Sequence, residues 1–251
     1  MLNISYIQFN PFFMKNAYLT AWFLLLSVYS HAQGANENLM RADFAEAARF
    51  GSRQSGFEGL RTHPSGVRGS QFFYPSWSKG SLITNSKQEL GDKYRYLFDK
   101  VRQELFIQVP DSNAIYLMNK TEIHSFILKT DKPHTFEIAS DFDPGRTTDF
   151  FEILVRSDKY TLLKSTKTTF VKFDPHDMMR TKNGEIYDEF VDEYTYYVTL
   201  RGGPLQAIPL KAGGIKKVLL AEKAKVTEYF NANAEEEIDE KFLAGLIGYL
   251  N

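Results

Sequence analysis

Three side chains in the middle of the chain could do metal or acid–base chemistry: His124, Asp141 and Asp143. Imidazole and carboxylate groups are common metal ligands and common general acids and bases. A hairpin folded about Lys132 places His124 opposite Ser140, within reach of the two aspartates that follow. The alternative is a histidine at a strand end beside a polar turn, with no metal and no catalysis.

The segment Asp141–Glu152 partly resembles a calcium-binding loop. Asp141, Asp143 and Glu152 occupy its first, third and twelfth positions. Gly145 stands at the fifth position, where a ligand is needed, instead of the sixth, where the loop bends. Ordinary turn chemistry of Asp, Pro and Gly explains the same residues. We therefore expect no metal site here, and no other motif suggests a cofactor.

Three aromatic residues are candidates for ligand binding: Trp77, Tyr94 and Tyr96. If a curved sheet leaves part of one face open, these side chains could line a groove for an apolar ligand or a peptide. Aromatic side chains on strands are usually buried, so the alternative is that all three belong to the core.

Composition limits the possible function classes. The chain has 251 residues, 43% of them hydrophobic, and a formal net charge of −1, which gives no electrostatic case for a nucleic-acid partner. The absence of cysteine excludes disulfides, thiol catalysis and a lipid-modified cysteine. The sequence contains no nucleophile elbow, zincin helix, phosphate-binding loop or dinucleotide fingerprint. No catalytic residue is therefore assigned, and an enzyme is the less favoured interpretation.

The N-terminus has the pattern of a secretory signal peptide. After Met14 comes one lysine, then the apolar run Ala17–Val28, then small residues at Ser30 and Ala32. We expect residues 1–32 to be the signal, with the true start at Met14 and cleavage before Gln33. Twelve apolar residues are too few to cross a bilayer core of about 30 Å, so we expect no membrane span in the mature chain.

The rest of the chain divides into two parts. Residues 33–66 are expected to form an N-terminal arm, with a short helix at 39–50 followed by a linker rich in Gly, Ser and Arg. Residues 67–251 are expected to form one β-rich domain, with a pair of helices from about residue 215.

Short apolar stretches recur at roughly ten-residue spacing through the domain. Strands are predicted at 67–73, 80–84, 93–98, 104–109, 114–119, 124–130, 134–139, 149–155, 160–173, 194–200 and 205–210. This spacing predicts an antiparallel meander that forms a curved sheet or a partly open barrel. The polar segment Phe173–Glu193 is expected to be a long loop between two strands.

The segment Lys93–Val109 has no Gly or Pro, yet it must contain two strands. One strand of seventeen residues would span about 56 Å, too long for this domain. Tyr94, Tyr96 and Phe98 share one face, whereas Leu105 and the apolar residues after it have the opposite parity. A turn at 99–102 accounts for the change.

The following hairpin can be given a register. Folding about Lys132 sets Leu128 opposite Phe136, and Phe126 opposite Ile138, so that apolar residues meet on one face.

Two amphipathic helices are predicted at the C-terminus. The first runs from Ile215 to about residue 234, and Asn233 with Glu236 forms a capping box that opens the second. Phe242 is expected to be buried against the first helix or the sheet. The fold class is therefore mainly β with C-terminal helices (α+β), the sheet being capped by a helical hairpin.

Three stretches carry a resemblance to known sequences: "GSQFFYPSWSKGSLIT" (69–84), "YRYLFDKVRQELFIQ" (94–108) and "FFEILVRSDKYTLLK" (150–164). With the closing helices, these stretches resemble a widespread group of uncharacterised exported proteins of Bacteroidota-type bacteria. The resemblance implies export and a β-rich single domain. It implies no activity and no site residue.

Three functions are compatible with these patterns. The first is an exported, non-catalytic protein of the periplasm or cell envelope, a binding or scaffold module for an envelope protein or an apolar ligand. The second is a small outer-membrane barrel, although most predicted strands are shorter than the nine to eleven residues that a barrel needs. The third is a hydrolase with a carboxylate site at Asp141 and Asp143.

Overall fold

The computed structural model of the protein describes residues 41–54, 66–112, 114–174, 187–200 and 203–250. The chain divides into two units, 1–46 and 47–251, and all strands and C-terminal helices belong to the second. Residues 41–50 are helical. The predicted signal peptide lies outside the described residues. Within the described ranges, no helix is both long enough and apolar enough to cross a membrane.

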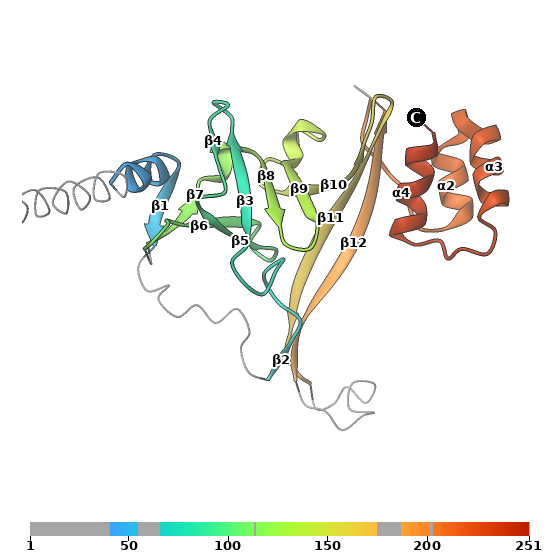
Figure 1. Cartoon of the computed structure of the whole chain (residues 1–251). Helices are drawn as coiled ribbons and strands as arrows, with labels where there is room; N and C mark the ends of the chain where they lie inside the picture. Colours follow the sequence, from blue (N-terminus) through green and yellow to red (C-terminus); the bar gives the residue numbers. More distant parts are fainter. Residues whose placement is uncertain (1–40, 55–65, 113, 175–186, 201–202, 251) are drawn as a thin grey trace, which may run out of the picture. The chain divides into compact units, whose positions relative to one another are not determined.

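The strands of the second unit form two mostly antiparallel sheets (Figure 1). The smaller sheet has the order β1–β7–β6–β5, with β1 (Gly51–Gln54), β5 (Arg95–Asp99), β6 (Glu104–Gln108) and β7 (Ile115–Met118). The larger sheet has the order β13–β12–β11–β10–β9–β8–β3–β4. Its strands are β3 (Lys79–Thr84), β4 (Glu89–Leu90), β8 (Ile123–Lys129), β9 (Pro133–Ile138), β10 (Phe150–Arg156), β11 (Tyr160–Val171), β12 (Asp188–Leu200) and β13 (Gln206–Ala207). A further strand, β2 (Val67–Arg68), pairs in parallel with β12.

This architecture confirms a mainly β fold with C-terminal helices, but the single meander was wrong. The chain changes from the smaller sheet to the larger one where it enters β3. Ser78 exchanges two backbone hydrogen bonds of 2.9 Å with Tyr96 of β5, and the next residues pair with β8. Gly80 permits the close approach, because a Cβ there would lie 2.0 Å from the Ile127 carbonyl oxygen. The chain therefore passes from one sheet to the other within two residues.

Phenylalanine rings fill the space between the sheets. Phe98 of β5 lies 5.1 Å from Phe126, 5.2 Å from Phe136 and 6.0 Å from Phe150, measured between ring centroids. All four side chains are buried. Because each ring removes a large apolar area from water, this contact stabilises the packing of one sheet on the other.

The segment 93–109 forms two strands, as predicted. Tyr96 lies opposite Ile107 and Phe98 opposite Leu105 in the β5–β6 hairpin. The turn occupies residues 100–103, one residue later than expected. The Asp99 carboxylate accepts hydrogen bonds of 2.9 and 3.0 Å from two backbone N–H groups of this turn, which fixes its position.

The predicted register of the β8–β9 hairpin was wrong by two residues. Phe126 pairs with Phe136, and Leu128 pairs with His134. The loop is centred on Asp131 instead of Lys132. A shift of two residues leaves every side chain on the same face of the sheet. The apolar face was therefore predicted correctly, but the residues that lie opposite each other were not.

Asp131 explains the position of this loop. Its carboxylate accepts hydrogen bonds from the hydroxyls of Thr130 and Tyr74, at 2.7 and 3.2 Å. The Thr130 bond, together with backbone N–H groups of the turn, lowers the pKa of Asp131 to about 2. The side chain is thus a charged acceptor that holds the turn around itself.

The C-terminal region contains three α-helices instead of two: α2 (Ala212–Val218), α3 (Lys223–Ala232) and α4 (Glu240–Tyr249). A short 3₁₀ helix, η4 (Leu220–Glu222), separates α2 from α3. The predicted capping box at Asn233 was wrong, because Asn233 ends α3 by donating a hydrogen bond to the Tyr229 carbonyl. Helix α4 begins instead at Asp239, whose carboxylate accepts a bond from the Phe242 N–H.

The helices and the larger sheet share one apolar cluster. On the sheet it includes Leu162, Tyr196 and Val198, and on the helices Ile215, Leu219, Val226, Leu243, Leu246 and Ile247. Figure 1 shows α4 on the side of the helices nearest to β12. Phe242 is 2% exposed and contacts Tyr229 and Phe230 of α3, which confirms its predicted burial.

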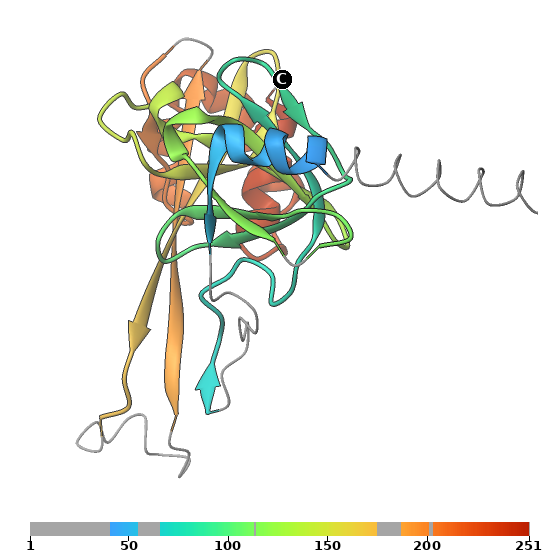
Figure 2. The same cartoon turned by 90° about the vertical axis from the view of Figure 1, so that its left-hand side faces the viewer.

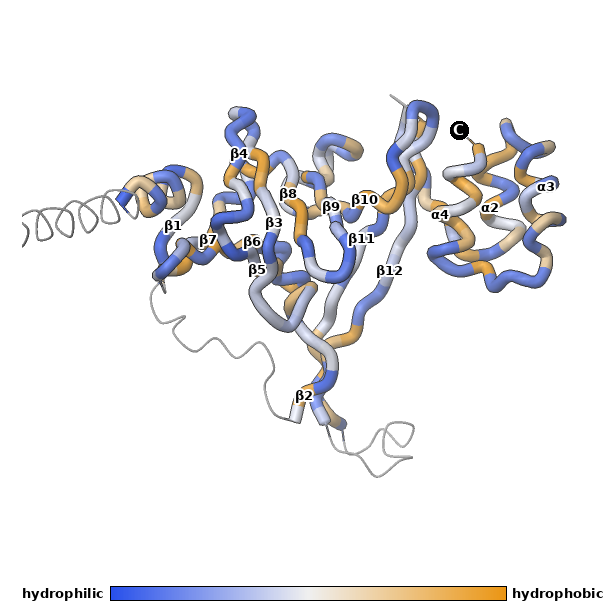
Figure 3. Tube along the Cα trace, in the orientation of Figure 1, coloured by the Kyte–Doolittle hydropathy of each residue, from blue (hydrophilic) through white to orange (hydrophobic). Residues whose placement is uncertain are grey.

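Two strands arise from segments that were expected to be irregular. Strand β1 lies in the predicted linker and pairs with β7. Strand β12 begins at Asp188, six residues before the predicted strand, and pairs with β11 from Glu189 to Leu200. Figure 2 shows the long β11–β12 pair with β2 beside one end. Figure 3 shows an apolar segment and a hydrophilic segment next to each other along β12.

Candidate binding edge and the polar network behind it

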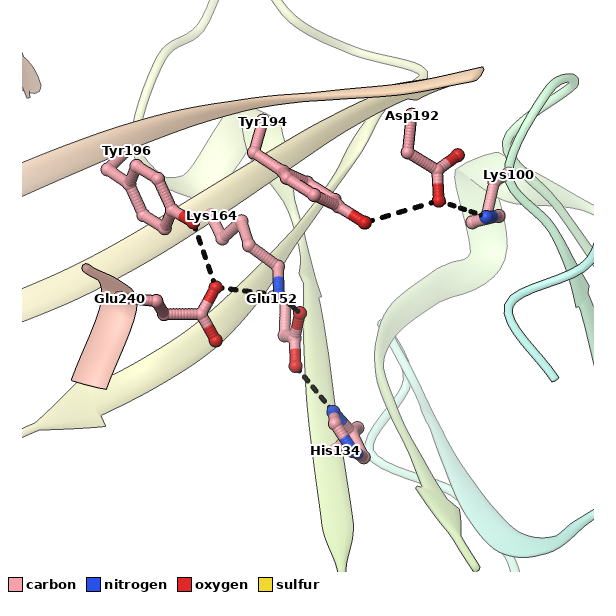
Figure 4. Close-up of polar contacts among 8 residues, drawn as sticks. All are labelled: Lys100, His134, Glu152, Lys164, Asp192, Tyr194, Tyr196 and Glu240. Atoms are coloured by element: carbon pink, nitrogen blue, oxygen red, sulfur yellow. Dashed lines mark hydrogen bonds and ion pairs between the residues drawn. The ribbon is translucent and has the colours of Figure 1, made fainter. Parts of the chain in front are cut away.

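A buried ionic network lies on one face of the larger sheet (Figure 4). The Glu152 carboxylate is central: Oε1 lies 2.5 Å from His134 Nδ1, and Oε2 lies 2.8 Å from Lys164 Nζ. Lys164 Nζ also lies 3.0 Å from Glu240 Oε2. The side chain of Glu152 is 5% exposed and that of Lys164 is 11% exposed. Charges this deep are tolerated because each has a partner.

Sheet register brings these residues together. Glu152 of β10 lies opposite Lys164 of β11, and Lys164 lies opposite Tyr196 of β12. Because paired residues project on the same face, the three side chains form a row. Glu240, in the first turn of α4, closes the row by accepting a 3.0 Å hydrogen bond from the Tyr196 hydroxyl.

The environment of this row raises the pKa of both Lys164 and Tyr196. Burial of the Lys164 ammonium acts to lower its pKa, but the carboxylates of Glu152 and Glu240 outweigh burial, so the pKa is raised. Burial and the Glu240 carboxylate raise the pKa of the Tyr196 phenol. Lys164 therefore stays a cation and Tyr196 stays neutral at physiological pH. Neither group is suited to accept a proton or to act as a nucleophile.

A second polar cluster holds the neighbouring part of β12. Asp192 lies 2.5 Å from the Lys100 ammonium, which comes from the β5–β6 turn, and it accepts a 2.6 Å bond from the Thr168 hydroxyl. The Tyr194 hydroxyl donates to Asp192 at 3.3 Å, and the Lys164 ammonium lies 5.3 Å from the Tyr194 ring centroid. Figure 4 shows that Asp192, Tyr194 and Tyr196 project from the same strand and that each makes a polar contact. The network therefore fixes β12 from one face.

The free edge of β12 lies between two short neighbouring strands. At one end β2 pairs with residues 188–189, and at the other β13 pairs with residues 197–198. Ile208 donates a 2.9 Å bond to the Tyr196 carbonyl, so even-numbered residues of β12 direct their backbone groups away from β11. Among the described residues, no backbone group bonds to the outward N–H and C=O of Asp192 and Tyr194.

This gap is an accessible template for another strand. Residues 191–195 span about 16 Å at ~3.3 Å per residue. The residue Tyr194 is 53% exposed. An exposed row of unpaired N–H and C=O groups is the feature to which extended peptides add. We name residues 191–195 the β12 window.

Two of the three aromatic candidates for ligand binding are buried in the core, which was the alternative interpretation of these residues. The residues Tyr94 and Tyr96 have no exposed surface, and the Tyr96 hydroxyl donates to the Leu90 carbonyl at 2.6 Å. Trp77 is partly buried and packs against Phe72 and Leu97 on the other face of the smaller sheet. The three candidates therefore do not line one surface, and packing between and beside the sheets accounts for their burial.

The structure brings together only part of the predicted acid–base set. His124 Nδ1 lies 3.2 Å from Asp141 Oδ2. Asp143 turns away, because its carboxylate pairs with Arg146 at 3.5 Å and accepts a bond from the Gly145 N–H. In the described part of the chain, no three His, Asp or Glu side chains are grouped to hold a metal ion. The segment after Asp141 is a turn stabilised by its own side chains.

Sequence reasoning missed the network and the β12 window. Glu152 is a single acidic residue among the apolar residues of β10, and that was the available signal.

Comparison with known proteins adds no family. No protein-family model matches the sequence, and neither curated proteins nor solved structures provide a match.

Proposed function

We propose that the protein is an exported, non-catalytic binding module of the bacterial periplasm or cell envelope, which captures an extended polypeptide segment at the β12 window. The observation that carries this proposal is that the outward N–H and C=O groups of Asp192 and Tyr194 have no backbone partner among the described residues. The side chains of the same two residues are fixed by the polar network on one face of the sheet. A rigid edge reduces the entropy that binding would otherwise cost.

The side chains beside the window indicate which segments would fit. Phe170 and Phe190 pair across β11 and β12, with ring centroids 4.9 Å apart, on the same face as Tyr194. The residue Phe170 is 40% exposed. A strand added to β12 would place every second side chain beside these rings. We therefore favour partners with apolar or aromatic residues at alternate positions.

The charge pattern disfavours pairing of two copies of this protein. An antiparallel pair centred on Glu193 would place the two Glu193 carboxylates directly opposite each other. Centring the pair on Asp192 would instead oppose the two Asp192 carboxylates. Like charges at paired positions destabilise a sheet, so the edge is better suited to a different polypeptide.

Binding through the backbone can be tested at one residue. Tyr194→Pro removes the outward N–H without removing a bond to β11, and proline is tolerated at such edge positions. Peptides selected from a random linear library on the wild-type protein should bind Tyr194→Pro at least tenfold more weakly, with a smaller loss for Tyr194→Ala. Titration calorimetry measures both, and circular dichroism confirms that each variant is folded.

Two outcomes would count against the β12 window. If selected peptides bind Tyr194→Pro as well as they bind the wild type, the edge is not their site. If Tyr194→Ala loses as much affinity as Tyr194→Pro, the side chain and not strand pairing determines binding.

Export is proposed from residues 14–32 and from the resemblance to exported Bacteroidota-type proteins. Cleavage after Ala32 should give a mature chain that begins at Gln33, partly as pyroglutamate. Mass spectrometry of protein purified from cell-envelope and periplasmic fractions measures this end directly. A chain that still contains Met14 would contradict the proposal.

A further inference from the structure

The opposite face of the larger sheet carries an open polar pocket of about 720 Å³. Its walls include His124, Glu137, Asp141 and Arg156. This volume lies within the range of about 300–1,000 Å³ that small-molecule sites occupy. The residues of the polar network and the β12 window do not line it, so it is a separate site.

Two contact pairs supply most of the polar groups that line the pocket, and Asp158 adds a further carboxylate. The Arg156 guanidinium lies 2.6 Å from Glu137 Oε2, and His124 lies 3.2 Å from Asp141. Each pair leaves further donors and acceptors, because a guanidinium has five N–H groups and a carboxylate accepts several bonds. A charged ligand would have to compete with these existing pairs. A neutral ligand with many hydroxyls could bond to them without separating them.

Sheet register adds hydroxyl groups to the same wall. Arg156, Thr161 and Thr199 lie opposite one another across β10, β11 and β12. Both threonines line the pocket beside Arg156. The row presents one guanidinium and two hydroxyl groups at the spacing of neighbouring strands, about 4.8 Å. The Thr199 hydroxyl donates to the Gly203 carbonyl at 2.9 Å and can still accept a bond. Such a row can contact successive hydroxyls along one edge of a ligand.

An aromatic side chain completes the site. Phe142 lines the pocket and packs against Phe151, with ring centroids 6.1 Å apart. Phe142 is only partly buried. A sugar ring has an apolar face of C–H groups and an edge of hydroxyls. An aromatic wall with convergent polar groups matches both parts.

We propose that this pocket binds a neutral carbohydrate. Apolar ligands are disfavoured because they would bury the Arg156–Glu137 and His124–Asp141 pairs without new hydrogen bonds. Hydroxyl groups can satisfy the remaining donors and acceptors of the same pairs. The site is independent of the proposed peptide binding, and a variant at either site should leave the other intact.

Affinity electrophoresis tests this site. The protein is run through native gels that contain soluble starch, hydroxyethyl cellulose, xylan, galactomannan or the anionic polysaccharide alginate. At least one neutral polysaccharide should retard the wild type. The double variant His124→Ala/Thr161→Val should raise the dissociation constant at least tenfold. Thr169→Val is the matched control, because it lies on the same strand and face but outside the pocket, and it should bind normally.

Three results would overturn the proposal. The first is that no neutral polysaccharide retards the wild-type protein. The second is retardation by alginate alone, which would indicate an anionic ligand. The third is equal retardation of the wild type and the double variant, which would place binding elsewhere. Thermal unfolding of the double variant shows whether a loss of binding reflects a loss of folding.

Discussion

Replacing Phe242 by alanine is expected to lower the free energy of unfolding by about 3–5 kcal/mol, the usual cost of removing a buried phenylalanine. Phe242 lies between the ring of Tyr229 at 5.3 Å and that of Phe230 at 5.0 Å. The backbone geometry around it is fixed by the cap at Asp239, so the cavity has little freedom to close. Urea denaturation measures the change.

The neighbouring Lys241 provides the control for this substitution. It is exposed on the same helix, and Lys241→Ala should change stability by less than about 0.5 kcal/mol. If Phe242→Ala left the denaturation midpoint unchanged, the helices would contribute nothing to the stability of the sheet, contrary to the shared apolar cluster.

Breaking the buried ion pair should have an effect of similar size. Lys164→Met retains the length of the side chain but leaves the Glu152 carboxylate without its cation, at an expected cost of about 3–5 kcal/mol. Adding Glu152→Gln should recover a large part of that loss, because the second change removes the uncompensated charge. Urea denaturation of both single variants and the double variant gives the coupling energy.

A more exposed pair is the reference for this cycle. Lys159 of the β10–β11 turn pairs with Glu222 of η4, and the Lys159 side chain is 40% exposed. Lys159→Met should therefore cost much less stability than Lys164→Met, because solvent screens this pair. If Lys164→Met lowered the free energy of unfolding by no more than Lys159→Met, the buried network would be as weak as a surface ion pair. It would then not stabilise β12 as described.

Local patterns predicted the strands well where the partner was close in sequence. The change of parity between Tyr96 and Leu105 identified two strands, because period-two alternation is a local property. Register was less predictable. The loop at Asp131 depends on Tyr74, which lies 57 residues away along the chain, and no local pattern contains that contact.

The grouping of strands into sheets could not be read from spacing. Ser78 and Lys79 belong to different sheets, and their separation depends on which partners, β5 and β8, lie beside them. The β12 window could not be predicted for a related reason. Residues 188–193 looked like the end of a polar loop because Asp192 and its neighbours are charged, and only Lys100 and Thr168 make that charge compatible with a strand.

The short strand β2 gives the β12 window one of its limits. It joins Val67 to Asp188, on the order of 120 residues apart, yet only two residue pairs form. The entropic cost of closing a loop grows slowly with its length, by about 0.6 kcal/mol for each doubling. The stability of the β2–β12 pairing is therefore limited by the small number of contacts that the two strands make. They include Arg68 over the Tyr187 ring at 3.6 Å.

Pairing of this kind opens at a free energy well below that of global unfolding. When β2 separates, the edge available to a partner extends back to residue 188. The length of strand that a partner can occupy is therefore an equilibrium property, set by the ratio of closed to open β2, and not a fixed dimension of the fold.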